Sequence, residues 1–369
     1  MNRRQAAHSM AAVMTLVTSG VAHAQSSVTI YGLMDAGVTW VSNQGGHGNA
    51  ILDQGIYYPN ILGFRGVEDL GGGARAIFKL ENQFNLANGQ TIGDSSALFG
   101  RVAYVGLAKD GIGQLTFGNQ YDFMWENLLK ADGSMTFGGY YNFRSGPYAG
   151  LGIPNNPTGA SDFDRVAGSA RVPSSVKFVS DRLGGFTFGA LYGFGGVAGN
   201  FAKDRSISVG VNYQGGPLYV GAAYTDVKYQ QINNGDDGIR NWGVGGTYAI
   251  GSALLNALFT ETWNTFNGAR VYAGQVGALY NFTPFLSFGA DYQLMKGNAT
   301  LDRILTQQVT ATLSYRLSKR TNVYLEGAYQ HAGNGSAPTF AQINGLYGQD
   351  AASSSSNQAI ARVGIAHLF

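Results

Sequence analysis

Charged side chains recur on one face of several short apolar segments of the chain. Arg75, Lys79 and Glu81 share one face of the segment 74–81, whose other face is mostly apolar, and Arg101 lies on the same kind of face in a later segment. Charged side chains are rarely fully buried unless they are paired. These residues therefore indicate that their face of each segment borders water.

Catalytic and metal-binding sites are difficult to assemble from this chain. It contains no cysteine, and removal of the N-terminal segment discussed below leaves only His47, His331 and His367 as histidines. Nucleophilic catalysis needs a base beside a serine, and a metal site needs closely spaced ligands. The segment 233–238 is rich in Asn and Asp but lacks the late glutamate of a calcium loop. We expect no enzymatic activity, metal or cofactor; a hydrolase that uses His47 or His331 is the alternative from another class.

Three aromatic residues follow one another at alternate positions. Tyr121, Phe123 and Trp125 could form a surface on which sugar rings stack. The same spacing also suits aromatic anchors that hold a loop against a neighbouring wall. Both interpretations stay open at this point.

The overall composition narrows the class of protein. Only 12% of the 369 residues are charged and 12% are aromatic, which is unlike a disordered chain. The formal net charge of +2 is too small to indicate nucleic acid as a partner. Because the chain has no cysteine, it contains no disulfide bonds. Its 55 glycines are suited to tight turns.

The first 24 residues have the features of a cleaved secretory signal peptide. Arg3 and Arg4 precede the short apolar stretch 10–17, and Ala22-His23-Ala24 matches a cleavage site. This stretch is too short to cross a bilayer as a helix, and no later apolar run reaches 18 residues. We therefore expect residues 1–24 to be removed and residues 25–369 to form an exported domain. Cleavage removes two of the 24 Lys and Arg and none of the 22 acids, so the exported domain has no net charge.

The exported domain shows the period of two that is typical of β-strands with one apolar face. It recurs from residue 27 to residue 369, for example in segments 74–81, 186–194, 286–293 and 309–316, with Leu191 as an exception. Short turns rich in Gly, Asp and Pro alternate with long polar connectors, of which we expect three at 43–55, 121–169 and 332–357. This alternation predicts about sixteen antiparallel strands with all the short turns at one end.

The two faces of these strands differ in a way that favours a membrane barrel. Charged residues avoid the apolar face, and Phe or Tyr lie near its ends, as Phe186, Phe194 and Tyr315 do. Aromatic girdles and an uncharged band are typical of barrels in lipid, where a mid-depth Lys or Arg costs about 2–4 kcal/mol. A soluble secreted β-protein with adhesive loops is the remaining alternative. The terminal Phe369 ends the last alternating segment and is expected to act as a signal for barrel assembly.

Several longer motifs resemble one known family, the general porins of β-proteobacteria of the neisserial and Burkholderia type. The motifs cover essentially the whole exported domain and comprise Ser27–Gly32 with Asp35, Leu62–Gly71, Leu98–Arg101, Tyr104–Leu107, Tyr315–Thr321 and Gly364–Phe369. The resemblance implies an all-β fold, a 16-stranded antiparallel transmembrane β-barrel with short periplasmic turns and long external loops. It also implies a homotrimer in the outer membrane that lets small hydrophilic solutes and ions diffuse passively.

The resemblance further implies that the third long loop folds inward and narrows the pore. That loop should begin near Asn119 and carry charges that face charges on the wall. The expected constriction comprises Asp122, Glu126, Asp132 and Arg144 on the loop and Arg75, Lys79, Glu81, Arg101 and Arg171 on the wall. Outer-membrane lipid, lipopolysaccharide and the barrel assembly machinery are the other expected partners.

Two departures from the family pattern bear on selectivity. Ile61 and Asn119 stand where the family usually carries arginine, so two basic positions are neutral here. Many relatives prefer anions, and we therefore expect this pore to be only weakly selective. A substrate-specific channel for sugars or organic anions is the alternative.

Overall fold

A computed structural model gives the structure of the chain. It describes residues 27–92, 97–133, 148, 151–152, 162–336, 338–345 and 351–369. The expected signal peptide (1–24) and Arg144 lie outside the described residues.

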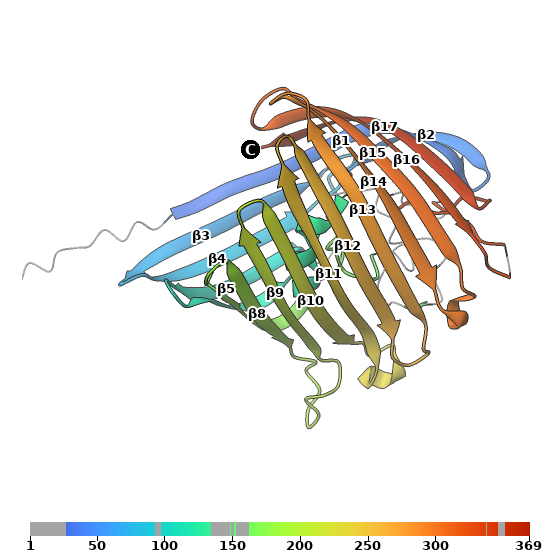
Figure 1. The fold of residues 1–369 in the computed structure, drawn as a ribbon. Helices are drawn as coiled ribbons and strands as arrows, with labels where there is room; N and C mark the ends of the chain where they lie inside the picture. The colour runs from blue at the N-terminus through green and yellow to red at the C-terminus, as the bar shows by residue number, and fades with distance from the viewer. Residues whose placement is uncertain are drawn as a thin grey trace, which may run out of the picture.

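The described residues form one antiparallel sheet that closes on itself as a 16-stranded barrel (Figure 1). One strand position of the barrel is occupied by two segments, because β2 and β3 pair with successive parts of the same edge of β1. On its other edge β1 pairs with β17, which closes the barrel. The strands are β1 (Ser27–Gln44), β2 (His47–Gln54), β3 (Ile61–Gly71), β4 (Ala74–Gln83), β5 (Val102–Lys109), β6 (Gly113–Gln120), β7 (Val172–Ser180), β8 (Phe186–Gly193), β9 (Ser206–Gly215), β10 (Leu218–Lys228), β11 (Gly238–Ile250), β12 (Ala253–Asn264), β13 (Arg270–Asn281), β14 (Leu286–Gly297), β15 (Leu305–Arg316), β16 (Thr321–Gly333) and β17 (Asn357–Leu368).

Helices are few and short. The described residues contain α1 (Phe123–Leu128), followed directly by η1 (Leu129–Ala131), and the single turns η3 (Asn233–Gly235) and η4 (Ala299–Leu301). None of these helices is long and apolar enough to cross a membrane.

The connectors differ between the two ends of the barrel, as expected. At the end that we call the short-turn end, β3–β4, β9–β10 and β11–β12 are joined by two residues each. The opposite, long-loop end carries the connector 121–171, which we call the third connector, and the connector 334–356. The expected loop at 43–55 is different: β1 and β2 continue through it and turn at Gly45 and Gly46, whose φ angles are +61° and +101°. Polar residues in an extended hairpin are hard to distinguish from a loop by composition.

The period of two separates the faces of the wall. On β15, Val309, Leu313 and Tyr315 are exposed on the outside, whereas Thr310 and Thr312 are buried on the inside. The outer face therefore carries the apolar residues that lipid requires, and the inner face carries the polar ones.

Residues 55–60, which connect β2 to β3, leave the barrel wall and interrupt this strand position. The Asp35 carboxylate on β1 accepts hydrogen bonds from the backbone N–H groups of Ile56 (2.7 Å) and Tyr57 (3.1 Å). The Tyr57 ring stacks on Tyr324 of β16 with 4.5 Å between centroids, so this short segment folds into the barrel. Arg362 of β17 lies 3.2 Å from the same Asp35 carboxylate and completes a buried ion pair.

Candidate pore constriction

The third connector turns into the barrel directly after β6 and begins with α1. Asp122 caps this helix, because its Oδ1 accepts the N–H groups of Met124 (3.0 Å) and Trp125 (3.4 Å). An aspartate is among the preferred residues at this position, where backbone donors have no partner within the helix.

Glycines of four consecutive strands form the seat on which α1 lies. Cβ atoms added at these positions would lie only 2.2–2.8 Å from atoms of Phe123, Asn127 and Leu128. No larger residue fits while the helix stays in place. The seat consists of Gly189 on β8, Gly210 on β9, Gly221 on β10 and Gly243 on β11.

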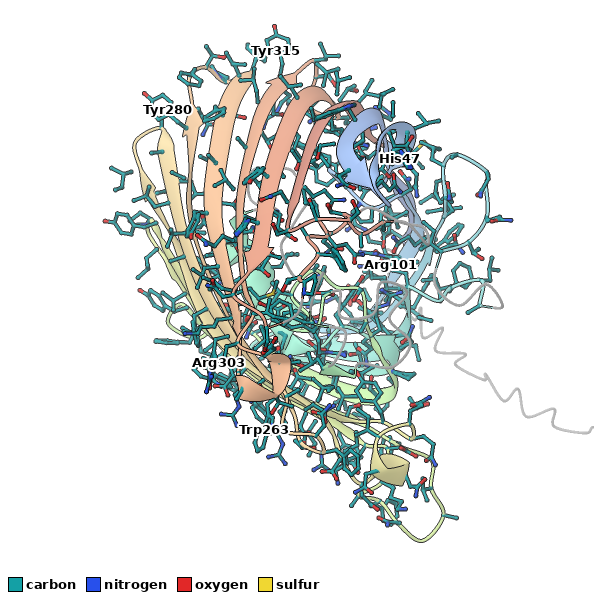
Figure 2. All side chains as sticks on the ribbon, turned by 90° about the vertical axis from the view of Figure 1, so that its right-hand side faces the viewer. His47, Arg101, Trp263, Tyr280, Arg303 and Tyr315 are labelled. Atoms are coloured by element: carbon teal, nitrogen blue, oxygen red, sulfur yellow. The ribbon has the colours of Figure 1, made fainter. Side chains whose placement is uncertain are left out.

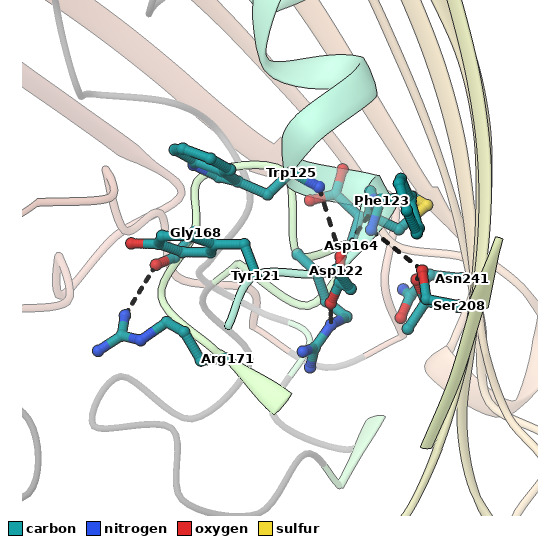
Figure 3. Close-up of polar contacts among 12 residues, drawn as sticks. Tyr121, Asp122, Phe123, Trp125, Asp164, Gly168, Arg171, Ser208 and Asn241 are labelled. Atoms are coloured by element: carbon teal, nitrogen blue, oxygen red, sulfur yellow. Dashed lines mark hydrogen bonds and ion pairs between the residues drawn. The ribbon is translucent and has the colours of Figure 1, made fainter. Parts of the chain in front are cut away.

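Apolar packing and polar bonds hold the connector on this seat. Phe123, Met124 and Leu128 are buried in one cluster with Leu191, which explains why this apolar residue interrupts the polar stripe of β8. The N–H of Phe123 donates to Ser208 Oγ at 3.0 Å (Figure 3). Further bonds run from Tyr219 Oη to Asn127 O (2.6 Å), from Asn256 Nδ2 to Ala131 O (3.0 Å) and from Asn241 Nδ2 to Phe163 O (2.8 Å).

On the opposite wall a buried carboxylate gathers two cations. Glu81 of β4 lies 2.8 Å from Lys79 Nζ and 3.5 Å from Arg101 Nε. Tyr31 donates its hydroxyl to the same carboxylate at 2.7 Å, and Arg101 Nη1 donates to Gln83 at 2.6 Å. These contacts hold the side chains of Lys79, Glu81 and Arg101 in fixed orientations.

Aromatic rings link this wall to the start of the third connector. Arg101 and Arg171 both lie over the ring of Tyr121, at 5.5 and 5.6 Å from its centroid. Tyr121 is itself stacked on Trp125 at 3.9 Å and is only 5% exposed. Figure 3 shows the Trp125 ring stacked above the Tyr121 ring, with Arg171 bonded to the carbonyl of Gly168. Tyr121 therefore serves as an anchor rather than as an open stacking surface.

A further ion pair joins the helix to the wall. Lys177 of β7 lies 2.5 Å from Glu126 on α1, and its ammonium group also donates to the carbonyl of Tyr121 at 3.0 Å. A small cavity is lined by both partners together with Lys79, Tyr104 and Trp125. The structure therefore brings together Lys79, Glu81, Arg101, Glu126 and Arg171 of the expected constriction.

Other expected constriction residues lie elsewhere. Arg75 is ion-paired with Asp110 at 2.7 Å, near the short-turn end. Asp122 is buried as the helix cap and paired with Arg165. Asp132 is fully buried and accepts a bond from Gln275 of β13 at 3.3 Å.

Buried aspartates lie in the returning part of the third connector. Burial, and secondly the neighbouring Asp164 carboxylate, raise the pKa of Asp162 to about 6. Hydrogen bonds from the N–H groups of Ala167 (2.8 Å) and Ser169 (2.7 Å) oppose this shift in part. Burial lowers the pKa of the Arg165 guanidinium, but Asp122, Tyr229 and Asp162 together raise it further, so that it lies above its ordinary value.

Two residues of this region were not anticipated. Lys177 stands on the inner face of β7, so the rule that selected Lys79 on β4 would also have selected it. Arg165 lies in a connector without periodicity, and its pairing with Asp122 follows from the folded path of the chain. No pattern in the sequence indicates that pairing.

Comparisons with known proteins agree with this architecture. A family model described as Gram-negative porin matches residues 9–335. The chain is 28% identical to an outer membrane porin protein of Bordetella pertussis, over 87% of this chain and 93% of that protein. It is also 28% identical to outer membrane porin protein 32 of Delftia acidovorans, over 98% and 99% of the two chains. The structure of an anion-selective porin from Comamonas acidovorans superposes with a TM-score of 0.75 at 24% identity, covering 94% of this chain and 100% of that one.

Proposed function

The chain belongs to the Gram-negative porin family and is an outer-membrane porin of the β-proteobacterial type; from this premise we propose how its channel selects solutes. Its barrel is a water-filled channel for passive diffusion of small hydrophilic solutes and ions. We propose that it is non-enzymatic and weakly selective, with a small preference for anions. The observation that carries the proposal is the cluster of Lys79, Glu81, Arg101, Glu126, Arg171 and Lys177 around the start of the third connector.

The charges of this region are nearly balanced but unequally accessible. Lys79, Arg171 and Glu126 are half-buried and reach solvent, whereas Glu81, Arg101 and Lys177 are buried. The aspartates beneath the connector, Asp122 and Asp162, are also buried. Solutes in the pore therefore contact more positive than negative charge, although the numbers of cations and anions in the whole region differ little. An accessible excess of this kind favours anions modestly and creates a field across the pore.

The proposal predicts opposite effects for two neighbouring substitutions. Arg101→Gln should lower the chloride-to-potassium permeability ratio. A charge about 5 Å away in water contributes about 0.8 kcal/mol, with opposite sign for the two ions, so the change is at most roughly 16-fold and is reduced by salt screening. Glu81→Gln should raise the same ratio. The measurement is the reversal potential of the channel in a planar bilayer under a potassium chloride gradient.

The matched control is Arg182→Gln, since Arg182 stands in the turn between β7 and β8 and contacts Gln214 at 3.0 Å. It should leave the ratio unchanged. Equal permeability ratios for Arg101→Gln, Glu81→Gln and the unmodified channel would show that this cluster does not control ion passage.

The substrate-specific alternative is not favoured by the geometry. The stacked pair Tyr121 and Trp125 is packed against arginines and a wall strand, so it presents no open aromatic path. The hydrolase alternative, which uses His47 or His331, gains no support from His331, because its Nδ1 contacts the Asn357 side chain and not a serine.

Three further features are part of the proposal and rest on the family. We propose that the channel is a homotrimer, that residues 1–24 are cleaved on export, and that Phe369 is read by the barrel assembly machinery. Chemical crosslinking of intact cells followed by gel electrophoresis tests the first, and N-terminal sequencing of the purified protein tests the second.

A further inference from the structure

A cavity of about 330 Å³ lies inside the barrel at the short-turn end. Residues of β13–β17 and of the turn 317–320 between β15 and β16 form its wall. Tyr57 and Tyr58, from the segment 55–60 that folds into the barrel, form its roof. We call this space the mouth cavity.

Alternation along β15 brings an arginine into the mouth cavity. Thr310 and Thr312 are buried on the inside of the barrel, and Ser314 and Arg316 continue the same stripe. Arg316 pairs directly with Asn322 of β16, which lines the same cavity. The Arg316 guanidinium is therefore presented to the water of the lumen and not to lipid.

The mouth cavity is separate from the constriction. Figure 2 shows Tyr280 and Tyr315 at one end of the wall and Arg101 of the constriction well away from Tyr315. Arg316 directly follows Tyr315, so the cavity lies at that end. It also shares no lining residue with the small cavity beside Lys177.

Hydrogen bonds and ring contacts hold the roof of the mouth cavity in place. The Tyr57 hydroxyl lies 3.2 Å from Ser314 Oγ, to which Asn322 Nδ2 also donates at 3.3 Å. The Tyr57 ring is stacked on Tyr324, and Tyr58 meets it edge-on with 4.9 Å between centroids. Tyr58 is half-buried, so part of its ring remains available to a solute.

The mouth cavity carries positive charge that no carboxylate balances. Arg316, Lys319 and Arg320 line it and are all exposed. None of its described lining residues is Asp or Glu. Within the part of the chain that the structure describes, no ion pair joins these three cations to a carboxylate.

The cations of the constriction are in a different situation. Lys79 and Arg101 pair with Glu81, and Lys177 pairs with Glu126. An anion that approaches them competes with a carboxylate that is already in place. The mouth cavity offers its charge-assisted hydrogen bonds without that competition.

The chemistry of the lining indicates the kind of anion. Arginine forks bind carboxylates in a bidentate manner, and aromatic side chains pack against flat rings. Leu279 and Leu368 add apolar surface, while Asn281 and Ser287 add polar groups. Ligand pockets commonly have volumes of about 300–1,000 Å³, so this small cavity suits a single ring with one or two carboxylates.

We propose that the mouth cavity binds small aromatic carboxylates on their way through the lumen. The carboxylates lie on Arg316 and Arg320, and the ring lies against Tyr58. This inference rests on the proposed function in one respect, because water of the channel must reach the cavity. It does not restrict the channel to such solutes, since others pass the cavity without binding.

The experiment measures phthalate binding to the full-length exported protein in detergent by isothermal titration calorimetry at pH 7.5. Arg316→Gln/Arg320→Gln should raise the dissociation constant at least tenfold. Arg316→Lys keeps the charge and should raise it much less. The neutral diol 1,2-benzenedimethanol, which has the same ring, should not bind detectably.

A second comparison tests the contribution of the ring. Tyr58→Leu should weaken the binding of phthalate and leave the weaker binding of succinate unchanged, because succinate has two carboxylates and no ring. Equal effects of Tyr58→Leu on the two dianions would contradict the proposed contact between the rings.

The matched controls remove cations outside the mouth cavity. Lys109→Gln/Arg182→Gln removes two cations at the same end of the barrel, one at the end of β5 and one in the turn between β7 and β8. Arg101→Gln alters the constriction. Both controls should bind phthalate as the unmodified protein does.

Two results would overturn the inference. The first is an equal dissociation constant for Arg316→Gln/Arg320→Gln and the unmodified protein. The second is a loss of phthalate binding in Arg101→Gln as large as in the cavity variant, which would assign the anion to the constriction. Planar-bilayer currents test the channel separately: phthalate binding by a protein that conducts no ions would contradict the proposed function and leave the site in place.

Discussion

Single residues of the constriction act through fixed partners rather than as free charges. The Glu81 carboxylate touches Lys79, Arg101 and the Tyr31 hydroxyl, so its position is determined from three sides. Its place on the inner stripe was predictable, because alternation along β4 decides which face each side chain takes. Its partner Arg101 stands just before β5, at the end of a connector that follows no such rule.

At the same scale, Asp162 makes the third connector sensitive to pH. Its folded pKa of about 6 exceeds the ordinary value of 3.8, so the folded connector binds this proton more tightly than the unfolded one. The folded third connector is therefore most stable below about pH 4. Its stability falls as the pH rises toward about 6 and stays at the lower level above that pH. We expect the exchange protection of the Ala167 and Ser169 amides, corrected for intrinsic rates, to fall between pH 5 and pH 7.5.

Asp162→Asn should remove most of this pH dependence, because the amide stays neutral and its oxygen still accepts one of the two backbone bonds. An identical pH slope in the unmodified protein and in this variant would assign the titration to another group.

At the scale of elements, the strands were largely predictable and the third connector was not. A period of two depends only on neighbours along the chain, so segments such as 309–316 reveal their faces directly. The seat of α1 depends on glycines of four strands whose sequence positions range from Gly189 to Gly243. Each of these glycines looks ordinary in sequence, and only the folded register brings them beneath one helix.

The seat predicts a specific effect of a larger residue on the pore. In Gly221→Val the added Cβ would lie 2.2 Å from the carbonyl oxygen of Asn127, which is backbone and cannot rotate away. We expect α1 to move toward the barrel axis at a cost of about 1–3 kcal/mol, as overpacking generally does. Single-channel conductance should therefore fall.

Gly327→Val is the control, since its outward Cβ has room and β-branched residues suit strands. Equal conductance of Gly221→Val and this control would mean that the helix can yield without narrowing the pore.

For the molecule as a whole, closure of the barrel depends on the first and last strands, which are far apart in sequence. Phe369 and Gly32 exchange two backbone hydrogen bonds of 3.1 Å, and the Phe369 ring lies where a Cβ on Gly32 would be, 2.2 Å from its Cζ. Every strand of a barrel in lipid needs both neighbours, because unpaired backbone groups are costly there. The chain end thus completes the wall by pairing with the first strand.

This geometry separates two roles of the terminal aromatic residue. Phe369→Ala keeps the backbone bonds to Gly32, so the purified and refolded barrel should retain its conductance and lose only about 1–2 kcal/mol of stability from the partly exposed ring. If the ring is read during assembly, the amount of folded porin in the outer membrane of cells should nevertheless fall several-fold. Phe285→Ala, which removes another exposed aromatic at the short-turn end, should leave that amount unchanged. Equal amounts for both variants would limit Phe369 to closing the barrel, because recognition by the assembly machinery then needs no terminal ring.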